Sequence, residues 1–346
     1  MKINAMSSEW KKFQDSFLDH LKMKIESRKL VDTVSETLQI SNSSAYKKIK
    51  GDTMLGLDEI IILASNYHIS LDQFLNYKSA PIPFLNDALR KMPLHPMDFI
   101  QNLQNHLNQL TALKNLSYIN LAGEIPIFHF MPFHKLFAFK LYAWNFTSWS
   151  IPKYEDKFDL NIFVKDEALM HAIDTCAHTY YHFSGIEIWN IRMIDNTLDQ
   201  LKYFIHMRVF HHKSIAQEIC SELFDLLDHL QKICITGTKR FETKDALNKS
   251  SVNIYMNEIV HSNEVIFVSS DLGDHLYCVI DAPNLIRTSD KKMTAYAKSW
   301  LHKTKKHSTQ ISGEGEKERR VLFEKLFSKM EKSRIEIDSL LNYVYS

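Results

Sequence analysis

The sequence contains little glycine and proline, with 8 of each among 346 residues. Few tight turns and many helical segments are therefore expected. The four cysteines are widely spaced and form no CxxC pair. This spacing argues against a disulfide scaffold or a zinc ribbon and favours a reducing, cytoplasmic setting.

Several other signatures are missing. No apolar run approaches the roughly 18 residues of a membrane span, and the polar, acid-containing first residues are not typical of a signal peptide. The sequence also lacks a Walker loop, a dinucleotide fingerprint, a GxSxG elbow and an HExxH motif. We therefore predict neither an enzyme nor a cofactor, and no membrane partner.

The composition, 45% hydrophobic and 24% charged, is that of a globular chain long enough for two or three cores. Charge is unevenly distributed along it. Residues 1–78 carry a net charge of +1, residues 79–286 carry −6, and residues 287–334 carry +8. The acidic middle would keep that part of the protein away from nucleic acid.

Apolar spacings of three and four predict five helices in the first 78 residues. The third helix, in the stretch NSSAYKKIKG, is short and contains three lysines but no acidic residue. Ser41 or Asn42 can cap its beginning, and Gly51 suits the left-handed position after its end. The five predicted helices lie at about residues 10–25, 30–38, 42–50, 57–67 and 70–76.

Two helices joined by a tight turn, the second short and basic, describe a helix-turn-helix. Residues Leu30 to Leu75 resemble the lambda-repressor-like (Xre-type) helix-turn-helix family. The resemblance lies in ETLQIS before the turn, SSAYKKIKG as recognition helix, LDEIIILA in the fourth helix and YHISLDQFL at the end. Ser35 stands where that family usually has alanine, and serine is small enough to preserve the close helix contact.

The resemblance implies binding to double-stranded DNA, with the start of the third helix in the major groove. Four residues would face base edges there, and two would contact phosphates. Because the domain is almost neutral, we expect a homodimer to be needed for tight binding. The alternatives are a solvated basic helix face, or a degenerate helix-turn-helix that binds protein. The base-facing residues are Asn42, Ser43, Ser44 and Lys47, and the phosphate-facing residues are Lys48 and Lys50.

Residues 79–97 hold four of the eight prolines and are predicted to be a linker. Residues 98–346 then form a larger sensing or oligomerisation domain. Its first helix, over residues 97–115, is amphipathic and is either a dimer helix or a core helix. Further helices are expected at residues 166–183, 195–210, 213–235, 291–303 and 316–342.

A strand and turn are expected over residues 119–133, two strands joined by the turn HSNE over residues 252–270, and a further strand over residues 274–281. The predicted fold class is therefore mainly α: a five-helix lambda-repressor-like domain followed by a larger, helix-rich α+β domain with a small sheet late in the sequence. The aromatic-rich run from Phe128 to Trp149 fills a core or lines a pocket for an effector.

Three further features have ordinary explanations. His178 and His182 have the spacing of metal ligands but no acidic partner at a fixed spacing, so we predict no metal site. Asp225, Asp228 and His229 are expected on a solvent face. The basic end could contact phosphates or an acidic partner, or simply be solvated; its main residues are Lys298, Lys303, Lys305, Lys306, Arg319 and Arg320.

These observations predict a cytoplasmic, sequence-specific transcriptional regulator whose C-terminal domain binds a small-molecule or protein effector. Two alternatives remain. In the first, the protein is an antitoxin or defence-system regulator that acts through protein contacts, which co-purification of a stable partner would favour. In the second, the C-terminal part is an enzyme steered to DNA, which a buried cluster of titratable residues with perturbed pKa values in a cleft would favour.

Overall fold

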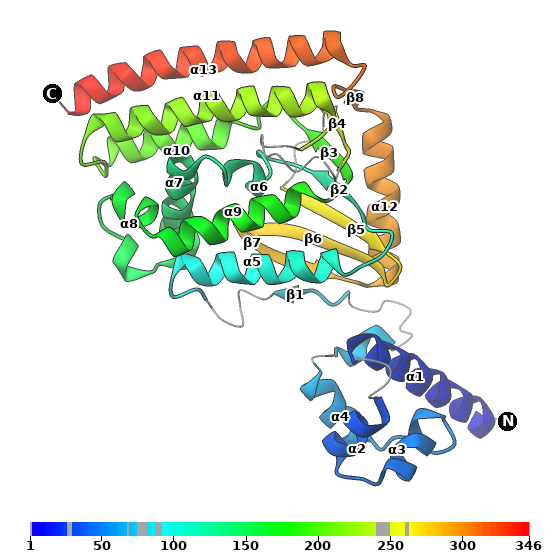
Figure 1. Cartoon of the computed structure of the whole chain (residues 1–346). Helices are drawn as coiled ribbons and strands as arrows, with labels where there is room; N and C mark the ends of the chain where they lie inside the picture. Colours follow the sequence, from blue (N-terminus) through cyan, green and yellow to red (C-terminus); the bar gives the residue numbers. More distant parts are fainter. Residues whose placement is uncertain are drawn as a thin grey trace. The chain divides into compact units, whose positions relative to one another are not determined.

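The computed structural model describes residues 2–25, 30–67, 69–74, 82–86, 92–239, 250–259 and 263–345. The chain divides into two compact units, Met1–Phe84 and Leu85–Ser346 (Figure 1). Within the described ranges, every helix is too short or too polar to cross a lipid bilayer. Helices outweigh strands in number and length, so the chain is a mainly helical α+β protein.

The N-terminal unit is helical throughout its described secondary structure. Its core contains Phe17 and Leu21 from the first helix, Val34 from the second, Ala45 from the third and Leu63 from the fourth. The fifth predicted helix is a short 3-10 turn in the residues described. The elements are α1 (Lys2–Lys24), α2 (Leu30–Leu38), α3 (Asn42–Ile49), α4 (Leu57–Asn66) and η2 (Leu71–Phe74).

The C-terminal unit combines long helices with one sheet. The helices are α5 (Pro96–Thr111), α6 (Ile127–Phe130), α7 (His134–Trp144), the π-helix η3 (Asn145–Trp149), the 3-10 helix η4 (Pro152–Tyr154), α8 (Leu160–Val164), α9 (Glu167–Tyr181), α10 (Asp195–His206), α11 (Lys213–Thr236), α12 (Lys291–Lys306) and α13 (Glu316–Val344). The strands are β1 (Leu85–Asn86), β2 (Ser117–Leu121), β3 (Gly185–Trp189), β4 (Val252–Met256), β5 (Val265–Ser270), β6 (Gly273–Asp281), β7 (Asn284–Thr288) and β8 (Thr309–Gln310).

Among the described residues, the sheet has eight strands in the order β1-β7-β6-β5-β2-β3-β4-β8. β2, β3 and β4 are parallel, whereas β5, β6 and β7 form an antiparallel meander beside β2. Helices cover both faces. Ala297 and Leu301 of α12 pack against one face, on Ile119, Ile188 and Phe267.

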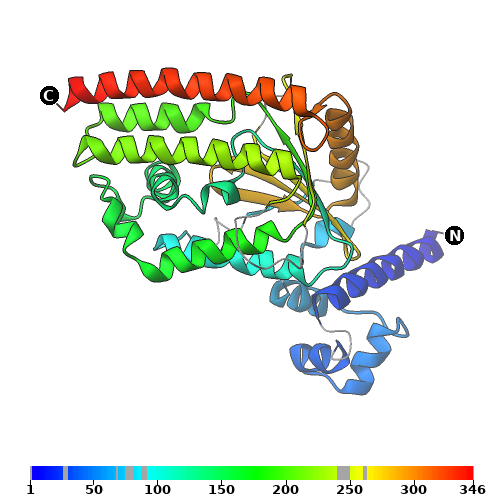
Figure 2. The ribbon, with the colours of Figure 1, turned by 45° about the horizontal axis from the view of Figure 1, so that its top comes forward.

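The opposite face carries the alternate residues of the same strands and belongs to the large core with α5, α7, α9 and α11. The long helices α11 and α13 lie side by side in both views (Figures 1 and 2). α5 packs on α9 and over the sheet, with Ile100 and Leu107 fully inside. Its apolar seam is therefore part of the core of this unit, as the second of the two interpretations predicted.

The sheet differs from the sequence prediction in three ways. It is neither small nor late, because its interior strands include β2 and β3, which lie before residue 190. The two strands expected as a hairpin, β4 and β5, are separated by β3 and β2. β1 lies inside the predicted 79–97 linker and pairs with β7, where Leu85 is opposite Arg287.

Candidate functional site

The turn between α2 and α3 is held by two serine hydroxyls. Ser35 Oγ donates to the carbonyl of Ile40 at 2.6 Å, so the small residue in α2 also closes the turn. Ser41 Oγ accepts a hydrogen bond from the backbone N–H of Ser44 and caps α3. Gln39 takes the left-handed conformation, with a φ of 53°. The sequence thus predicted the position of this turn and the cap.

The described side chains of α3 present a polar surface without an acid. Asn42 donates to Asp32 of α2 at 3.0 Å, so its amide is already oriented by the preceding helix. Tyr46, which the sequence analysis did not single out, is 55% exposed, and Lys50 lies over its ring. The predicted contact residues comprise exposed Asn42, Ser43, Lys47 and Lys50 and partly buried Ser44 and Lys48.

Lys48 differs from the other two lysines. Its Nζ pairs with Glu59 of α4 at 2.7 Å and donates to the carbonyl of Met54 at 3.1 Å. Glu59 also accepts from the N–H of Gly56 at the start of α4. The charge of Lys48 therefore ties α3 to α4, whereas Lys47 and Lys50 are exposed.

A buried glutamine fixes the end of α3 against α1. Gln14 is 2% exposed. Its Nε2 donates to the carbonyls of Lys48 and Thr53, both at 3.0 Å, and its Oε1 accepts from the N–H of Leu55 at 2.7 Å. Gly51, with a φ of +78°, makes the chain reversal between these partners possible. The sequence pattern gave no signal for Gln14, because it lies beside apolar Phe13 on a charged helix.

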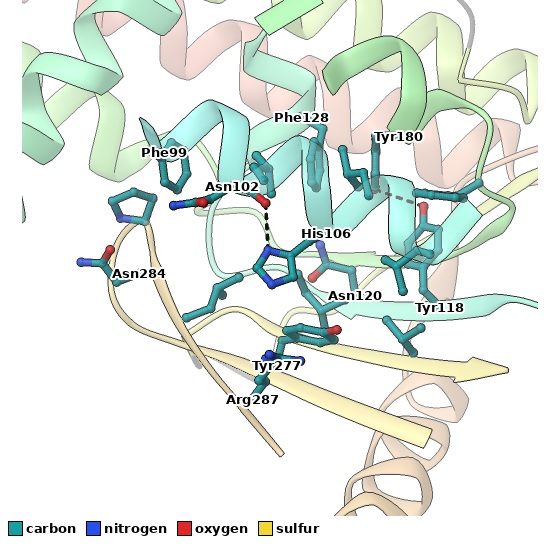
Figure 3. Close-up of a pocket in the computed structure, with 18 of the residues that line it drawn as sticks. Phe99, Asn102, His106, Tyr118, Asn120, Phe128, Tyr180, Tyr277, Asn284 and Arg287 are labelled. Atoms are coloured by element: carbon teal, nitrogen blue, oxygen red, sulfur yellow. Dashed lines mark hydrogen bonds between the residues drawn. The ribbon is translucent and has the colours of Figure 1, made fainter. Parts of the chain in front are cut away.

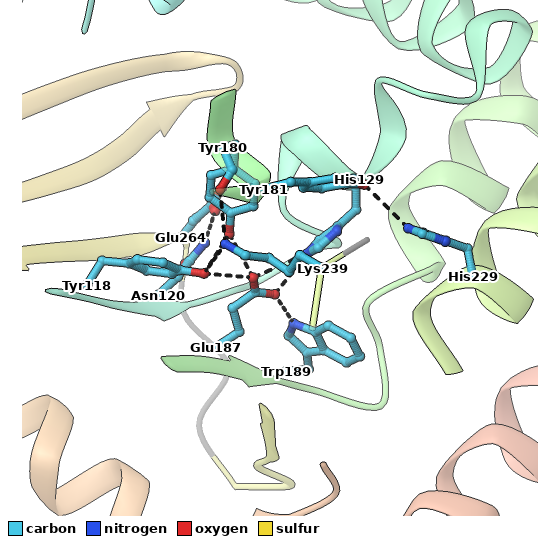
Figure 4. A network of polar contacts seen from close by, with 10 residues as sticks. All are labelled: Tyr118, Asn120, His129, Tyr180, Tyr181, Glu187, Trp189, His229, Lys239 and Glu264. Atoms are coloured by element: carbon cyan, nitrogen blue, oxygen red, sulfur yellow. Dashed lines mark hydrogen bonds and ion pairs between the residues drawn. The ribbon is translucent and has the colours of Figure 1, made fainter. Parts of the chain in front are cut away.

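The C-terminal unit contains a fully buried carboxylate, Glu187, on the interior strand β3 (Figure 4). One oxygen accepts from the hydroxyls of Tyr180 at 2.7 Å and Tyr118 at 3.1 Å. The other accepts from Trp189 Nε1 at 2.9 Å and contacts His129 Nε2 at 3.0 Å. Burial alone would raise the pKa of Glu187, but His129, Lys239 and the Tyr180 hydroxyl lower it to about 2.

Lys239 completes this network. Its Nζ donates to the Tyr118 hydroxyl at 2.9 Å and to the Tyr180 carbonyl at 3.2 Å, and lies 3.8 Å from the centre of the Tyr180 ring. Burial lowers the pKa of Lys239 to about 7, although the charge of Glu187 opposes the shift. Burial also raises the pKa values of both tyrosines.

The Tyr118 and Tyr180 rings form part of the wall of a pocket between α5 and the sheet (Figure 3). The pocket has a volume of about 190 Å³. A row of residues opposite one another crosses its floor, from Asn120 on β2 through Ile266 and Tyr277 to Arg287 on β7. Leucines of α5 and several aromatic rings form the rest of the wall.

Glycine is required where Tyr118 meets β3. Gly185 is the register partner of Tyr118, and a Cβ at Gly185 would lie 2.3 Å from the tyrosine ring. The ring can therefore lie over the backbone of β3 only because residue 185 has no side chain. In this position the Tyr118 hydroxyl donates to Glu187, and the Tyr118 ring lines the pocket.

Asn120 connects the pocket to a second unusual carboxylate. Its Nδ2 donates to Glu264 at 2.7 Å. Burial, assisted by Glu124 and Glu187, raises the pKa of Glu264 to about 7. The two glutamates thus have opposite pKa shifts: His129 and Lys239 outweigh the effect of burial at Glu187, whereas burial dominates at Glu264, which accepts from Asn120 and lies near the carboxylates of Glu124 and Glu187.

The sequence missed this region, although it held a weak signal. A charged residue inside a short apolar run, as in GIEIW, indicates a buried and paired group. The aromatic-rich run fits both of its predicted roles: Phe137 and Phe139 are core residues, whereas Phe128 and Trp149 line the pocket.

Two other predictions about single residues need correction. His229 was expected at a solvent face, but it is partly buried near Phe133 and Tyr181, and burial lowers its pKa to about 3. Arg319 was grouped with the basic end, but it is buried and donates to the carbonyls of Ile311 at 2.9 Å and Gly313 at 3.0 Å.

The remaining candidates lie at the surface. Asp225 and Asp228 are exposed as predicted, and His178 and His182 are exposed near the end of α9. In the part of the chain that the structure describes, no group of three or more histidine, cysteine or acidic side chains is arranged to hold a metal ion. Lys303 and Lys306 are exposed, while Lys298 pairs with Asp274 at 3.6 Å.

Comparison of the chain with protein-family models, with curated proteins and with solved structures found no match in any of the three.

Proposed function

We propose that the chain is a cytoplasmic, sequence-specific DNA-binding regulator of the lambda-repressor-like type, with α3 as its recognition helix. The observation that carries this proposal is the α2–turn–α3 arrangement with its Ser41 cap and acid-free, polar α3 surface. An element of this shape fits the major groove, where short polar side chains reach base edges. Tyr46, exposed on the same helix, is a further candidate contact.

In this proposal Ser43, Ser44 and Lys47 read bases, together with Asn42 once its bond to Asp32 is exchanged for a base. Lys50 contacts phosphate. Lys48 contributes less than the sequence suggested, because Glu59 already compensates its charge. We further propose a homodimer, since a unit with a net charge of +1 gains little from phosphate attraction alone.

The test is selection of bound sites from random duplex DNA, followed by binding titrations of the full chain. Lys47→Ala should reduce affinity for the selected site by about 1–3 kcal/mol and leave nonspecific binding nearly unchanged. Lys50→Ala should weaken both alike and reduce the salt slope by roughly 0.9. Lys22→Ala, which removes a lysine from α1 in the same unit, is the matched control.

The proposal fails if no sequence is enriched, or if Lys47→Ala and Lys22→Ala behave alike. Sedimentation of the full chain tests the dimer, and a monomer that binds the selected site tightly would contradict it.

A second candidate function, catalysis in the C-terminal unit, is favoured by the buried cluster of Glu187, Lys239, Tyr118 and Tyr180, whose pKa values are shifted beside a pocket. Lys239 has a pKa near 7, and an uncharged lysine amine can attack a carbonyl compound. The same lysine is only 1% exposed and is enclosed by two tyrosines and Glu187, so we favour a structural role. Borohydride trapping with small aldehydes, read by peptide mass spectrometry, separates the two: an adduct on Lys239 would support catalysis.

A further inference from the structure

The pocket between α5 and the sheet is lined mainly by apolar side chains. All but five of its 21 described lining residues are aliphatic, aromatic or proline. A cavity with such a wall attracts apolar molecules, because apolar surface is more stable away from water. The five exceptions are Asn102, His106, Asn120, Asn284 and Arg287.

The polar ends of several lining residues already have partners inside the protein. The hydroxyls of Tyr118 and Tyr180 donate to Glu187, so these two residues contribute ring surface to the wall. The side-chain amide of Asn120 donates to Glu264. A ligand that needed hydrogen bonds from these groups would have to break existing ones, which disfavours a polar ligand.

Several apolar side chains of the wall are only partly buried, although they pack against the main core of this unit. An apolar ligand in the pocket would cover them and remove their exposed surface from water, which favours binding. These side chains include Phe99, Leu103, Leu110, Leu116 and Ile266.

The pocket is long, because it follows α5 across several strands. Phe99 and Leu110 both line it and are eleven residues apart on α5, which corresponds to about 16 Å along the helix axis. The floor extends from Asn284 on β7 to Tyr118 on β2, and β6 and β5 lie between these strands in the sheet. Figure 3 shows Phe99 and Asn284 toward one end of the lining and Tyr118 toward the other.

The volume is small for this length. A cavity of about 150 Å³ holds one benzene molecule, which corresponds to about 25 Å³ for each carbon atom. At that density this pocket, with a volume of about 190 Å³, holds about eight carbon atoms. Eight carbon atoms in a space of this length fit as one extended chain rather than as a compact ring system.

We propose that this pocket binds an uncharged, unbranched aliphatic chain of about eight carbon atoms, carried by a small free molecule. A charge on the ligand is disfavoured because Arg287, the one described lining residue with a permanent charge, already has an interaction partner. The role of this molecule as an effector rests on the proposed function, whose sensing half it makes specific. Binding itself concerns the C-terminal unit alone, so its test uses no DNA and can fail independently of the DNA-binding proposal.

The test is calorimetric titration of the full chain with 1-butanol, 1-hexanol, 1-octanol and 1-decanol. We expect the Kd to fall about fourfold for each added CH2 group up to about eight carbons, and then to stop falling. A Kd that does not depend on chain length, or that falls at the same rate as far as 1-decanol, would overturn the proposal. Absence of 1-octanol binding at millimolar concentration would also overturn it.

Two further probes with the same number of carbons test charge and shape. Octanoate carries a carboxylate, and cyclooctanol is compact. Each should bind at least about tenfold more weakly than 1-octanol. If octanoate bound as tightly as 1-octanol, the ligand would not be uncharged, and if cyclooctanol did so, the extended shape would be wrong.

A variant with a filled pocket locates the site. Leu103→Trp places a larger side chain in the wall and should weaken 1-octanol binding about tenfold or more, while 1-butanol binding changes much less. Leu113→Trp is the matched control, because Leu113 is also partly buried and is not among the described lining residues. Equal effects of the two variants on 1-octanol would contradict this location. If Leu103→Trp does not fold, as judged by circular dichroism, the probe series on the unaltered chain decides.

Discussion

The same substitution at two glutamates should have opposite effects on the stability of the C-terminal unit. Glu187 has its pKa lowered from 4.5 to about 2, and Glu264 has its pKa raised from 4.5 to about 7. Each of these changes in pKa corresponds to about 3 kcal/mol, because a tenfold change in an equilibrium constant is about 1.4 kcal/mol. Glu187→Gln should therefore destabilise the unit by about 3 kcal/mol at pH 7, since the new amide also faces two donors.

The pH windows of the two effects differ. The stabilisation from Glu187 is complete above its unfolded pKa near 4.5 and is lost as the pH falls toward 2. For Glu264, whose folded pKa is the higher one, stability is lost as the pH rises from 4.5 to 7. Glu264→Gln removes this loss, so it should be nearly neutral at pH 4.5 and stabilise by up to about 3 kcal/mol above pH 7.

Urea unfolding at several pH values, followed by tryptophan fluorescence, measures both effects. Trp189 contacts Glu187 directly and reports on this unit. Loss of stability in both variants at pH 8, or a gain in Glu187→Gln, would refute the argument that the basic groups and donors around each carboxylate set the sign of the two shifts.

Three other predictions concern buried polar side chains. Gln14→Glu replaces the donor to two carbonyls by an acceptor, so the N-terminal unit should lose about 2–4 kcal/mol in chemical unfolding; a loss below 1 kcal/mol would show that the site relaxes. Arg319→Met should destabilise the C-terminal unit by a similar amount, because its carbonyl acceptors lose their donor. Arg320→Met, at an exposed position, should change the free energy of unfolding by no more than about 0.5 kcal/mol. Equal effects of the two variants would contradict the buried role of Arg319. Lys239 binds a proton less readily in the folded protein than in the unfolded chain, so the stability of the C-terminal unit should rise with pH from about 7 toward 10. Lys239→Met should flatten this rise in thermal unfolding measured between pH 7 and 9. An unchanged slope would assign the rise to another group.

The N-terminal unit was largely predictable because its signals are local. Helical spacing, the Ser41 cap and Gly51 act within a few residues of one another. The pairing of Lys48 with Glu59 was not predictable, since the two lie on different helices eleven residues apart.

The C-terminal sheet was harder to predict because its pairing is non-local. β3 is a five-residue strand, GIEIW, whose central Ile-Glu-Ile alternation suggests a solvent-facing glutamate, whereas Glu187 is fully buried. β1 has only two residues, and its pairing with β7 spans about two hundred positions. The pocket follows from that topology, because its floor combines residues from β2, β5, β6 and β7.

The position of Glu187 has a consequence for how the C-terminal unit folds. Its partners come from β2, α6, α9, β3 and Lys239 after α11, and so span residues 118–239. A partly folded chain that buried Glu187 before all of them arrived would carry an uncompensated charge. Intermediates lacking any one of these segments are therefore disfavoured, and the centre of this unit should form and open as a single cooperative step.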